Sequence, residues 1–164
     1  MTRSAVISGD RVYRYVLTRR WSAAPAMPWM CLNPSTADAD TDDPSIRRMC
    51  GFARREGCGG ICVLNLYAMR SPDPGALRDG ASLDPVGPDN DRWIAGLRIE
   101  FAVRAVVPVT VAWGANPLAA ARVPRVMELL AGLPAVCLGT TRSGAPRHPL
   151  YVRADAPLVP WVMS

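Results

Sequence analysis

The sequence predicts an α/β domain of three layers (α/β/α), in which helices cover both faces of a central, mainly parallel, four-stranded sheet. Two observations predict this class. Four apolar runs end in polar or small residues, as strands buried on both faces of a parallel sheet do. A helical segment with one apolar face separates the first two runs, which is typical of a right-handed βαβ unit. The runs cover residues 28–33, 61–67, 109–114 and 135–141.

The length and charge of the chain limit its class and its partners. A chain of 164 residues can bury a core without disulfides or metals, and we expect one domain over residues 1–164. The net charge is +5, and all nineteen basic residues are arginine. Arginine suits phosphate recognition, but a bias toward GC-rich codons explains the missing lysine as readily. The charge therefore permits an acidic partner such as nucleic acid without requiring one.

The cysteines and the single histidine bear on compartment and metal content. Five cysteines are an odd number without a C-x-x-C pair, and the chain starts with no signal peptide, so we expect a reduced, cytoplasmic protein. No apolar run approaches the roughly 20 residues that span a bilayer. One histidine among scattered cysteines argues against zinc, and we expect no metal, no cofactor and a monomer.

The first elements follow from local patterns. Residues 12–21 alternate weakly and are rich in β-formers, which predicts a strand that pairs near residues 29–32 through a short turn. A helix is predicted to begin at Asp43 as N-cap, with Pro44 in the first helical position, and to end before Gly57. Its apolar face consists of Ile46, Met49, Cys50 and Ala53.

The remaining elements are less regular. Residues 68–88 are rich in proline and glycine and are expected to form a long surface loop, followed by a helix over residues 89–104. Asn116 and Pro117 repeat the cap-plus-proline start for a helix that Pro124 is expected to interrupt. Two further expectations concern the end of the chain: a short edge strand at residues 150–152 and an apolar tail at residues 158–163 that packs on the body.

Polar residues at the ends of the four runs predict a site. Because the carboxyl ends of parallel strands meet at one edge of a sheet, we expect Asn33, Asn65, Gly114 and His148 to surround one cleft. The Asn33 amide can orient a water or a substrate group but cannot act as a general base. Its alternative role is an Asx turn that closes the strand. Asn65 lies within an apolar run, so its amide binds either backbone or the edge of a nucleobase.

Other candidate residues have structural alternatives too. His148 is the only histidine; it either decorates a loop, caps a strand, or faces the cleft. The aspartates of residues 38–43 suit solubility and helix capping, although Asp42 or Asp43 could supply a carboxylate to the site. Trp113 and Gly114 are as easily explained by core packing and a tight turn.

Ordered motifs along nearly the whole chain resemble a bacterial and phage family, the domain of unknown function numbered 1643. This resemblance implies no activity. The motifs that carry it are Leu32-Asn33-Pro34-Ser35-Thr36-Ala37-Asp38, Asp43-Pro44-Ser45-Ile46-Arg47-Arg48, Asn65-Leu66-Tyr67-Ala68, Asn90-Asp91, Trp113-Gly114 and His148-Pro149-Leu150-Tyr151.

Four of the motifs also occur in the order seen in the uracil-DNA glycosylase superfamily. Asn33-Pro34 resembles its Asn-Pro turn, and Asn65 is similar to the asparagine that reads the uracil edge. Val111-Ala112-Trp113-Gly114 resembles the hydrophobic strand of the superfamily that ends in Trp-Gly. His148-Pro149 resembles the His-Pro of the superfamily that stabilises the departing base. The chain departs from the superfamily at Ser35-Thr36, in place of a glycine, and at Leu150-Tyr151, in place of Ser-Pro. Its long intercalation loop and the water-activating aspartate are also not evident.

The distant resemblance implies a uracil-DNA glycosylase-like fold and an N-glycosidase, a hydrolase acting on a nucleobase in DNA or in a nucleotide, as in DNA repair or modification. Two alternatives remain: a non-catalytic module that binds a nucleotide or modified base, and a small-molecule N-glycoside hydrolase of nucleotide salvage. The expected catalytic residues are Asn33, His148 and Asp43. The expected substrate-binding residues are Asn65, Pro34, Ser35, Thr36, Tyr67, Trp113 and Gly114, with Tyr67 or Phe52 as a stacking aromatic.

Overall fold

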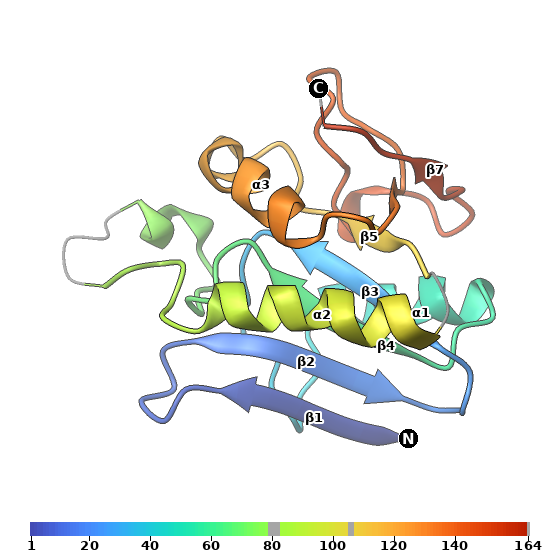
Figure 1. Cartoon of the computed structure of the whole chain (residues 1–164), viewed down its shortest axis with the longest axis horizontal. Coiled ribbons are helices and arrows are strands. Elements are labelled where there is room, and N and C mark those ends of the chain that lie inside the picture. The colour runs from blue at the N-terminus through green and yellow to red at the C-terminus, as the bar shows by residue number, and fades with distance from the viewer. Residues whose placement is uncertain (79–82, 105–106, 164) are drawn as a thin grey trace.

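A mixed sheet of seven strands forms the centre of the protein, in the order β1-β2-β4-β3-β5-β6-β7 (Figure 1). The computed structural model describes residues 1–78, 83–104 and 107–163, and these counts refer to that part of the chain. The strands are β1 (Thr2–Ile7), β2 (Arg14–Arg20), β3 (Ala26–Cys31), β4 (Gly60–Asn65), β5 (Val109–Val111), β6 (Ala135–Cys137) and β7 (Val159–Pro160). The helices are α1 (Pro44–Arg55), α2 (Asn90–Arg104) and α3 (Leu118–Leu129), with short 3₁₀ helices η1 (Pro74–Leu77) and η2 (Pro149–Tyr151).

The four predicted apolar runs form β3, β4, β5 and β6, and their pairings are parallel. The prediction of a four-stranded sheet is nevertheless wrong. Antiparallel strands extend it at both edges, with β2 and β1 beside β4 and with β7 beside β6. The N-terminal strand β1 was missed because none of its residues is fully buried, so it lacks a pronounced apolar face.

The partner of β2 also differs from the prediction. β2 pairs with β1 and β4, with Leu17 opposite Val63, and does not pair with β3. The chain from β2 to β3 is short enough for a hairpin. However, β3 is already hydrogen-bonded to β4 on one edge and to β5 on the other, so it has no free edge for β2.

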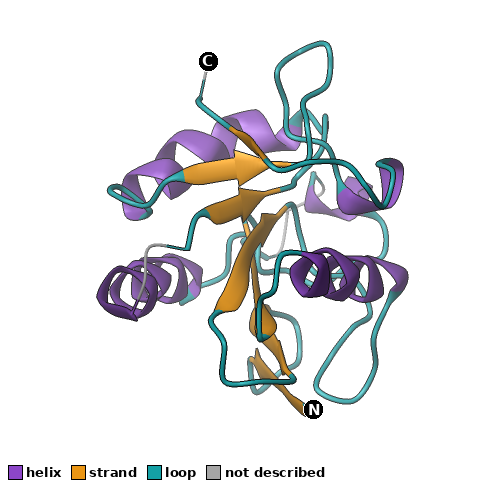
Figure 2. Ribbon diagram, turned by 90° about the vertical axis from the view of Figure 1, so that its right-hand side faces the viewer, coloured by secondary structure: helices purple, strands orange, loops and turns teal. Residues whose placement is uncertain are grey.

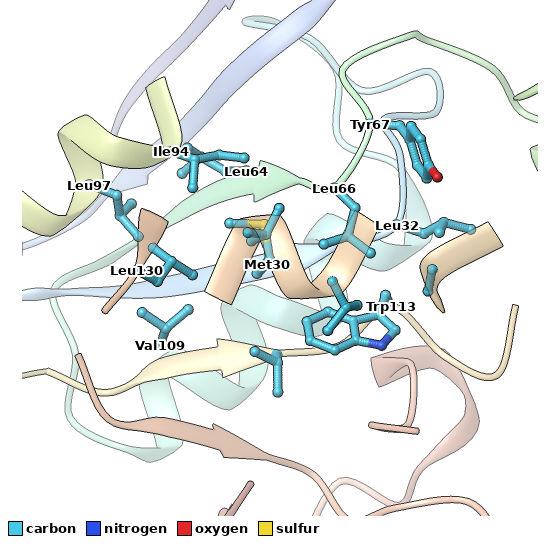
Figure 3. Close-up of a cluster of buried hydrophobic side chains, with 14 of the residues drawn as sticks. Met30, Leu32, Leu64, Leu66, Tyr67, Ile94, Leu97, Val109, Trp113 and Leu130 are labelled. Atoms are coloured by element: carbon cyan, nitrogen blue, oxygen red, sulfur yellow. The ribbon is translucent and has the colours of Figure 1, made fainter. Parts of the chain in front are cut away.

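Helices lie on both sides of the sheet (Figure 2). Successive residues of β3 point to opposite faces, as strand geometry requires. Trp29 packs with the apolar face of α1, whereas Met30 packs with α2 and α3 (Figure 3). The cluster on the α1 side includes Ile46, Met49, Phe52, Ile61 and Val63. The cluster on the other side includes Leu64, Ile94, Leu97, Val126 and Leu130.

Helix α1 confirms its sequence prediction at both ends. The Asp43 side chain accepts a hydrogen bond of 2.9 Å from the Ile46 N–H, Pro44 is the first helical residue, and Gly57 follows with φ of +72°. Its buried residues differ from the prediction at one place, because Phe52 is buried and Cys50 is only half-buried. Capping and helical periodicity are local properties, so the sequence alone was sufficient here.

Two local predictions near the C-terminus are wrong. Helix α3 runs through Pro124 without a break, since one lost backbone hydrogen bond is offset by the burial of Val123 and Val126 on either side. Residues 149–151 form η2 and not an edge strand, because Pro149 starts a helical turn and the His148 ring accepts the Leu150 N–H. The edge position is taken by β7 from the apolar tail, where Trp161 is buried. No helix in the described part of the chain has both the length and the apolar character needed to cross a membrane.

Candidate functional site

A cavity of about 730 Å³ lies where β3 and β5 end, at the carboxyl edge of the parallel strands. Six separate stretches of the chain form the cavity, so it brings together residues that are far apart in the sequence. The lining residues are Cys31, Leu32, Asn33, Ser35, Thr36, Asp43, Pro44, Ser45, Ser71, Pro72, Pro74, Trp113, Gly114, Ala115, Asn116, Thr141, Arg147, His148, Leu150 and Tyr151. Its size and its mixture of apolar and polar walls suit a small organic ligand of nucleotide size.

Asn33 connects two walls of the cavity. Its Nδ2 donates hydrogen bonds to the Ser71 carbonyl at 2.9 Å and to the Pro34 carbonyl at 3.1 Å. The Ser71 N–H donates in turn to the Pro34 carbonyl at 2.8 Å. The amide group therefore fixes the segment after β3 against the segment after β4. With Nδ2 committed to backbone, the side-chain atom with which Asn33 can meet a ligand is Oδ1, an acceptor.

One carboxylate oxygen of Asp43 has a structural hydrogen bond. Its Oδ1 accepts the Ile46 N–H and caps α1, while its carboxylate lines the cavity. The carboxylate is close enough to His148 to favour the protonated imidazole and so to raise the pKa of that group. Asp43 thus carries a negative charge into the same wall as the histidine.

The surroundings of His148 favour its neutral form. Burial lowers the pKa of His148 from its usual 6.5, and the carboxylate of Asp43 offsets only part of that shift. The Nδ1 atom accepts the Leu150 N–H at 3.4 Å, which assigns the proton of the neutral ring to Nε2. The ring also lies 5.8 Å, centroid to centroid, from Tyr151. His148 can therefore present a neutral N–H donor at neutral pH.

Trp113 and Gly114 position the end of β5 beside the histidine. The Gly114 N–H donates to the Pro146 carbonyl at 2.9 Å, which holds the segment before His148 against this turn. Gly114 has φ of +75°, a conformation that glycine adopts without strain. Trp113 is buried edge-to-face against Trp161, with centroids 5.1 Å apart, so its ring serves the core as well as the cavity wall.

Three predicted binding residues do not line the cavity. Asn65 is the register partner of Cys31 on the adjacent strand, but its side chain is 1% exposed and covered. The Tyr67 hydroxyl donates to the Leu118 carbonyl at 2.8 Å inside the α2 and α3 layer. Pro34 is buried and contributes its carbonyl to the Asn33 and Ser71 contacts. Phe52, considered for stacking, belongs to α1 and is buried in the core between this helix and the sheet.

Asn65 has a buried amide with an unusual environment. Its Nδ2 has no hydrogen-bond partner among the described residues, while its backbone carbonyl accepts from Asn90 Nδ2 at 3.1 Å. Asn90 and Arg122 both donate to the neighbouring Leu66 carbonyl. Asn90 and Arg122 therefore donate the hydrogen bonds that the backbone carbonyls at the end of β4 accept. Because Asp91 also forms an ion pair with Arg122, the Asn90-Asp91 motif has a structural role.

A buried arginine behind the cavity was missed by the sequence reasoning. Arg14 is 2% exposed, and its Nη1 donates to the Ala37 carbonyl at 2.8 Å, beneath the segment that carries Ser35 and Thr36. Burial lowers the pKa of Arg14 to about 10, so the group stays charged at pH 7. Burial also raises the pKa of Cys31 to about 12, so this cavity thiol is not a ready nucleophile. The sequence did contain a sign of this burial, because Arg14 lies on the same side of the predicted strand as Val12 and Val16.

Other cavity residues were not predicted. Arg147 is the one basic side chain other than His148 among the described lining residues, and its Nε donates to the Thr140 carbonyl at 2.9 Å. Asn116 was predicted only as a helix N-cap; its Oδ1 accepts the Leu118 N–H at 3.0 Å, but α3 begins at Leu118 and Pro117 is its N-cap. Ser71 comes from a loop, Thr141 follows β6, and Tyr151 belongs to η2; none of them was predicted to line the cavity. No group of three or more metal-binding side chains occurs in the described ranges.

The fold and the cavity define an α/β protein with a ligand-sized site at the carboxyl ends of its parallel strands. The chain belongs to the family described as "Protein of unknown function (DUF1643)", whose model matches residues 14–150. The matched region begins at Arg14 and contains every lining residue of the cavity except Tyr151. Comparison with curated proteins and with solved structures gave no match.

Proposed function

We propose that the cavity binds a nucleobase and that the protein is an N-glycosidase-like hydrolase acting on a nucleotide or on DNA. One observation carries this proposal: Asn33, Asp43 and His148, from three separate segments, line the same cavity. The order of the four motifs, which is similar to that in the uracil-DNA glycosylase superfamily, supports it. So does the layered arrangement of helices on both faces of a sheet in which four neighbouring strands, β4, β3, β5 and β6, are parallel; this arrangement suits a uracil-DNA glycosylase-like fold.

The proposed reaction breaks the bond between C1′ of the sugar and the base nitrogen. Positive charge develops on the sugar and the bonding electron pair leaves with the base. A water oriented by Asn33 Oδ1 adds to C1′, and its proton passes to the Asp43 carboxylate. His148, neutral and protonated at Nε2, donates a hydrogen bond to the base oxygen, where negative charge accumulates. The Asp43 carboxylate also stabilises the cationic sugar by proximity.

The alternative of a non-catalytic binding module has its own support. Asn33 Nδ2 and Asp43 Oδ1 already have structural hydrogen bonds, so both residues are explained without any chemistry. In that case the same cavity would hold a nucleotide or modified base without turnover. A small-molecule N-glycoside hydrolase remains the third possibility, because the cavity volume suits one nucleotide.

One experiment separates the three possibilities. Pure protein is incubated with single-stranded and duplex oligonucleotides containing modified bases, and separately with free nucleotides and nucleosides. Bound ligand and released base are both measured. Release from oligonucleotides supports the proposal. Release from free nucleotides alone supports the salvage hydrolase, and binding without release supports the module.

The residue test uses two substitutions of His148. His148→Ala should lower the rate of the chemical step by about 10²–10³ and change ligand affinity little, because the donor acts on charge that develops in the transition state. His148→Asn is the matched variant, since its Oδ1 can keep accepting the Leu150 N–H while Nε2 is lost. Single-turnover rates should be equally low for both. A wild-type rate in either variant removes His148 from the mechanism.

A further inference from the structure

Two arginines of α1 hold the segment that follows His148. Arg48 Nε donates to the Pro149 carbonyl at 3.2 Å, and its Nη2 donates to the Val152 carbonyl. Two turns later, Arg55 Nη1 donates to the carbonyls of Ala154 and Ala156 at 2.8 and 2.7 Å. The two arginines therefore bind four backbone carbonyls between residues 149 and 156.

The aromatic ring of Phe52 orients both guanidinium groups. The Arg48 group lies 5.1 Å from the ring centroid and the Arg55 group 5.0 Å. Phe52 is 2% exposed, so its ring has a fixed place in the core. A guanidinium that stacks on a buried ring and donates from two nitrogens has little freedom left. The contact at residues 149 and 152 is thus rigid.

The carboxylate of the site lies at the start of the same helix. Asp43 is the N-cap of α1, and Arg48 lies five residues further along it. The Arg48 contact reaches the carbonyl of the residue directly after His148. On the other side, the Arg147 N–H donates to the Gly139 carbonyl at 2.9 Å. Arg48 thus connects the segment after His148 to the helix that Asp43 caps.

We propose that Arg48 is the positioning residue of the site: it holds the His148–Val152 turn against α1 and so fixes the imidazole relative to Asp43 in the cavity wall. The effect on catalysis rests on the function proposed above, but the placement of the ring does not. A lysine could not replace this arginine, because an ammonium group offers no planar fork to reach two carbonyls from a stacked position.

The single histidine makes the placement measurable. The imidazole signals in an NMR titration belong to His148 alone. The groups around it are Asp43 and Arg48 on α1, Arg147 beside it in the chain and Tyr151 on η2. Arg48→Lys keeps the charge and most of the stem but loses the fork. Arg48→Met loses the charge as well.

If Arg48 positions the ring, both variants expose His148 more and raise its pKa toward the usual 6.5. A purely electrostatic effect would raise the pKa in R48M and leave R48K unchanged, and this outcome overturns the proposal. So does a wild-type titration in both folded variants. Arg54→Lys is the matched control, because Arg54 lies on the same helix but stacks on Trp21, 4.1 Å from its centroid. Its titration should equal that of the wild type.

Two further measurements distinguish a failure of this proposal from a failure of the proposed function. If R48M does not fold, R48K carries the test alone, since it conserves charge and stem. Where the wild type releases base, R48K should lower kcat at least tenfold with little change in KM, while R54K leaves both unchanged. If the wild type releases no base, the function proposed above fails, yet the NMR titration still decides whether Arg48 positions His148.

Discussion

His148 combines burial with a single nearby carboxylate, and this environment predicts a pH effect on stability. Its pKa is lowered in the folded state by burial, while the unfolded chain has the usual value near 6.5. As pH falls below 6.5, the unfolded chain binds a proton before the folded protein does. His148 should therefore contribute stability above pH 6.5 that is lost as pH falls through the folded pKa.

The measurement compares urea unfolding of the wild type with that of His148→Asn at pH 7.5, 6.5 and 5.5. The carboxylates titrate in both proteins, so their contribution cancels in the difference. The wild type should lose stability relative to the variant on acidification, by at most about 1.4 kcal/mol per pH unit for one group. A relative gain in acid would mean that the ring is charged in the folded protein.

At the scale of an element, Asp43 both caps α1 and carries a negative charge, and substitutions can test these two roles separately. Asp43→Ala loses both and should cost about 1 kcal/mol of stability, whereas Asp43→Asn keeps a good N-cap and loses only the charge. Because the carboxylate raises the pKa of His148, the Asn variant should titrate at a lower pH than the wild type in the same NMR experiment. An unchanged titration would show that the two groups do not interact. Thermal unfolding provides the stability control.

Elements that depend on local patterns were predictable, and contacts between distant segments were not. Helix α1 follows from Asp43, Pro44 and a helical apolar spacing, all within a few residues. The partner of β2 depends on which edges of β3 are already occupied, a property of the whole sheet. The uninterrupted course of α3 through Pro124 depends on burial against the sheet, which overrides the local preference.

The site was predictable to the extent that strand ends share an edge. That rule brought Asn33, Gly114 and His148 to one cavity. It does not tell whether a side chain is covered, and Asn65 is covered although it neighbours Cys31. Arg14 acts from an antiparallel strand that the rule does not include, and Arg147 comes from a loop.

At the scale of the whole molecule, the arginines bear on a nucleic-acid partner. Four arginines, at residues 47, 48, 54 and 55, belong to α1 and would be candidates for phosphate contacts by their charge. However, Arg48 and Arg55 bind backbone carbonyls and Arg54 stacks on Trp21. These contacts reduce the number of arginines free to meet phosphates, while Arg147 lies in the cavity wall. A contact to DNA near the site should therefore involve Arg147.

Salt dependence tests this expectation. Binding of a duplex oligonucleotide, measured by fluorescence anisotropy between 25 and 200 mM salt, should weaken with a slope of about −0.9 per phosphate contacted. Arg147→Gln should reduce that slope by about one contact. The control is Arg125→Gln, the same charge change at a residue that pairs with Asp91 and lies outside the cavity lining. Undetectable or salt-insensitive binding would rule out DNA and favour a free nucleotide.

The floor of the cavity is formed by a strand and its walls by connecting segments, and this difference affects the entropy of ligand binding. The floor is the end of β3, in which all six residues are buried and which is hydrogen-bonded along both edges. The walls come from connecting segments such as residues 71–74 and the turn at His148. Amide exchange should be slowest in such a central strand and faster in the connections. The floor is therefore preorganised for a ligand. The conformational entropy lost on binding comes mainly from ordering the connecting segments that form the walls.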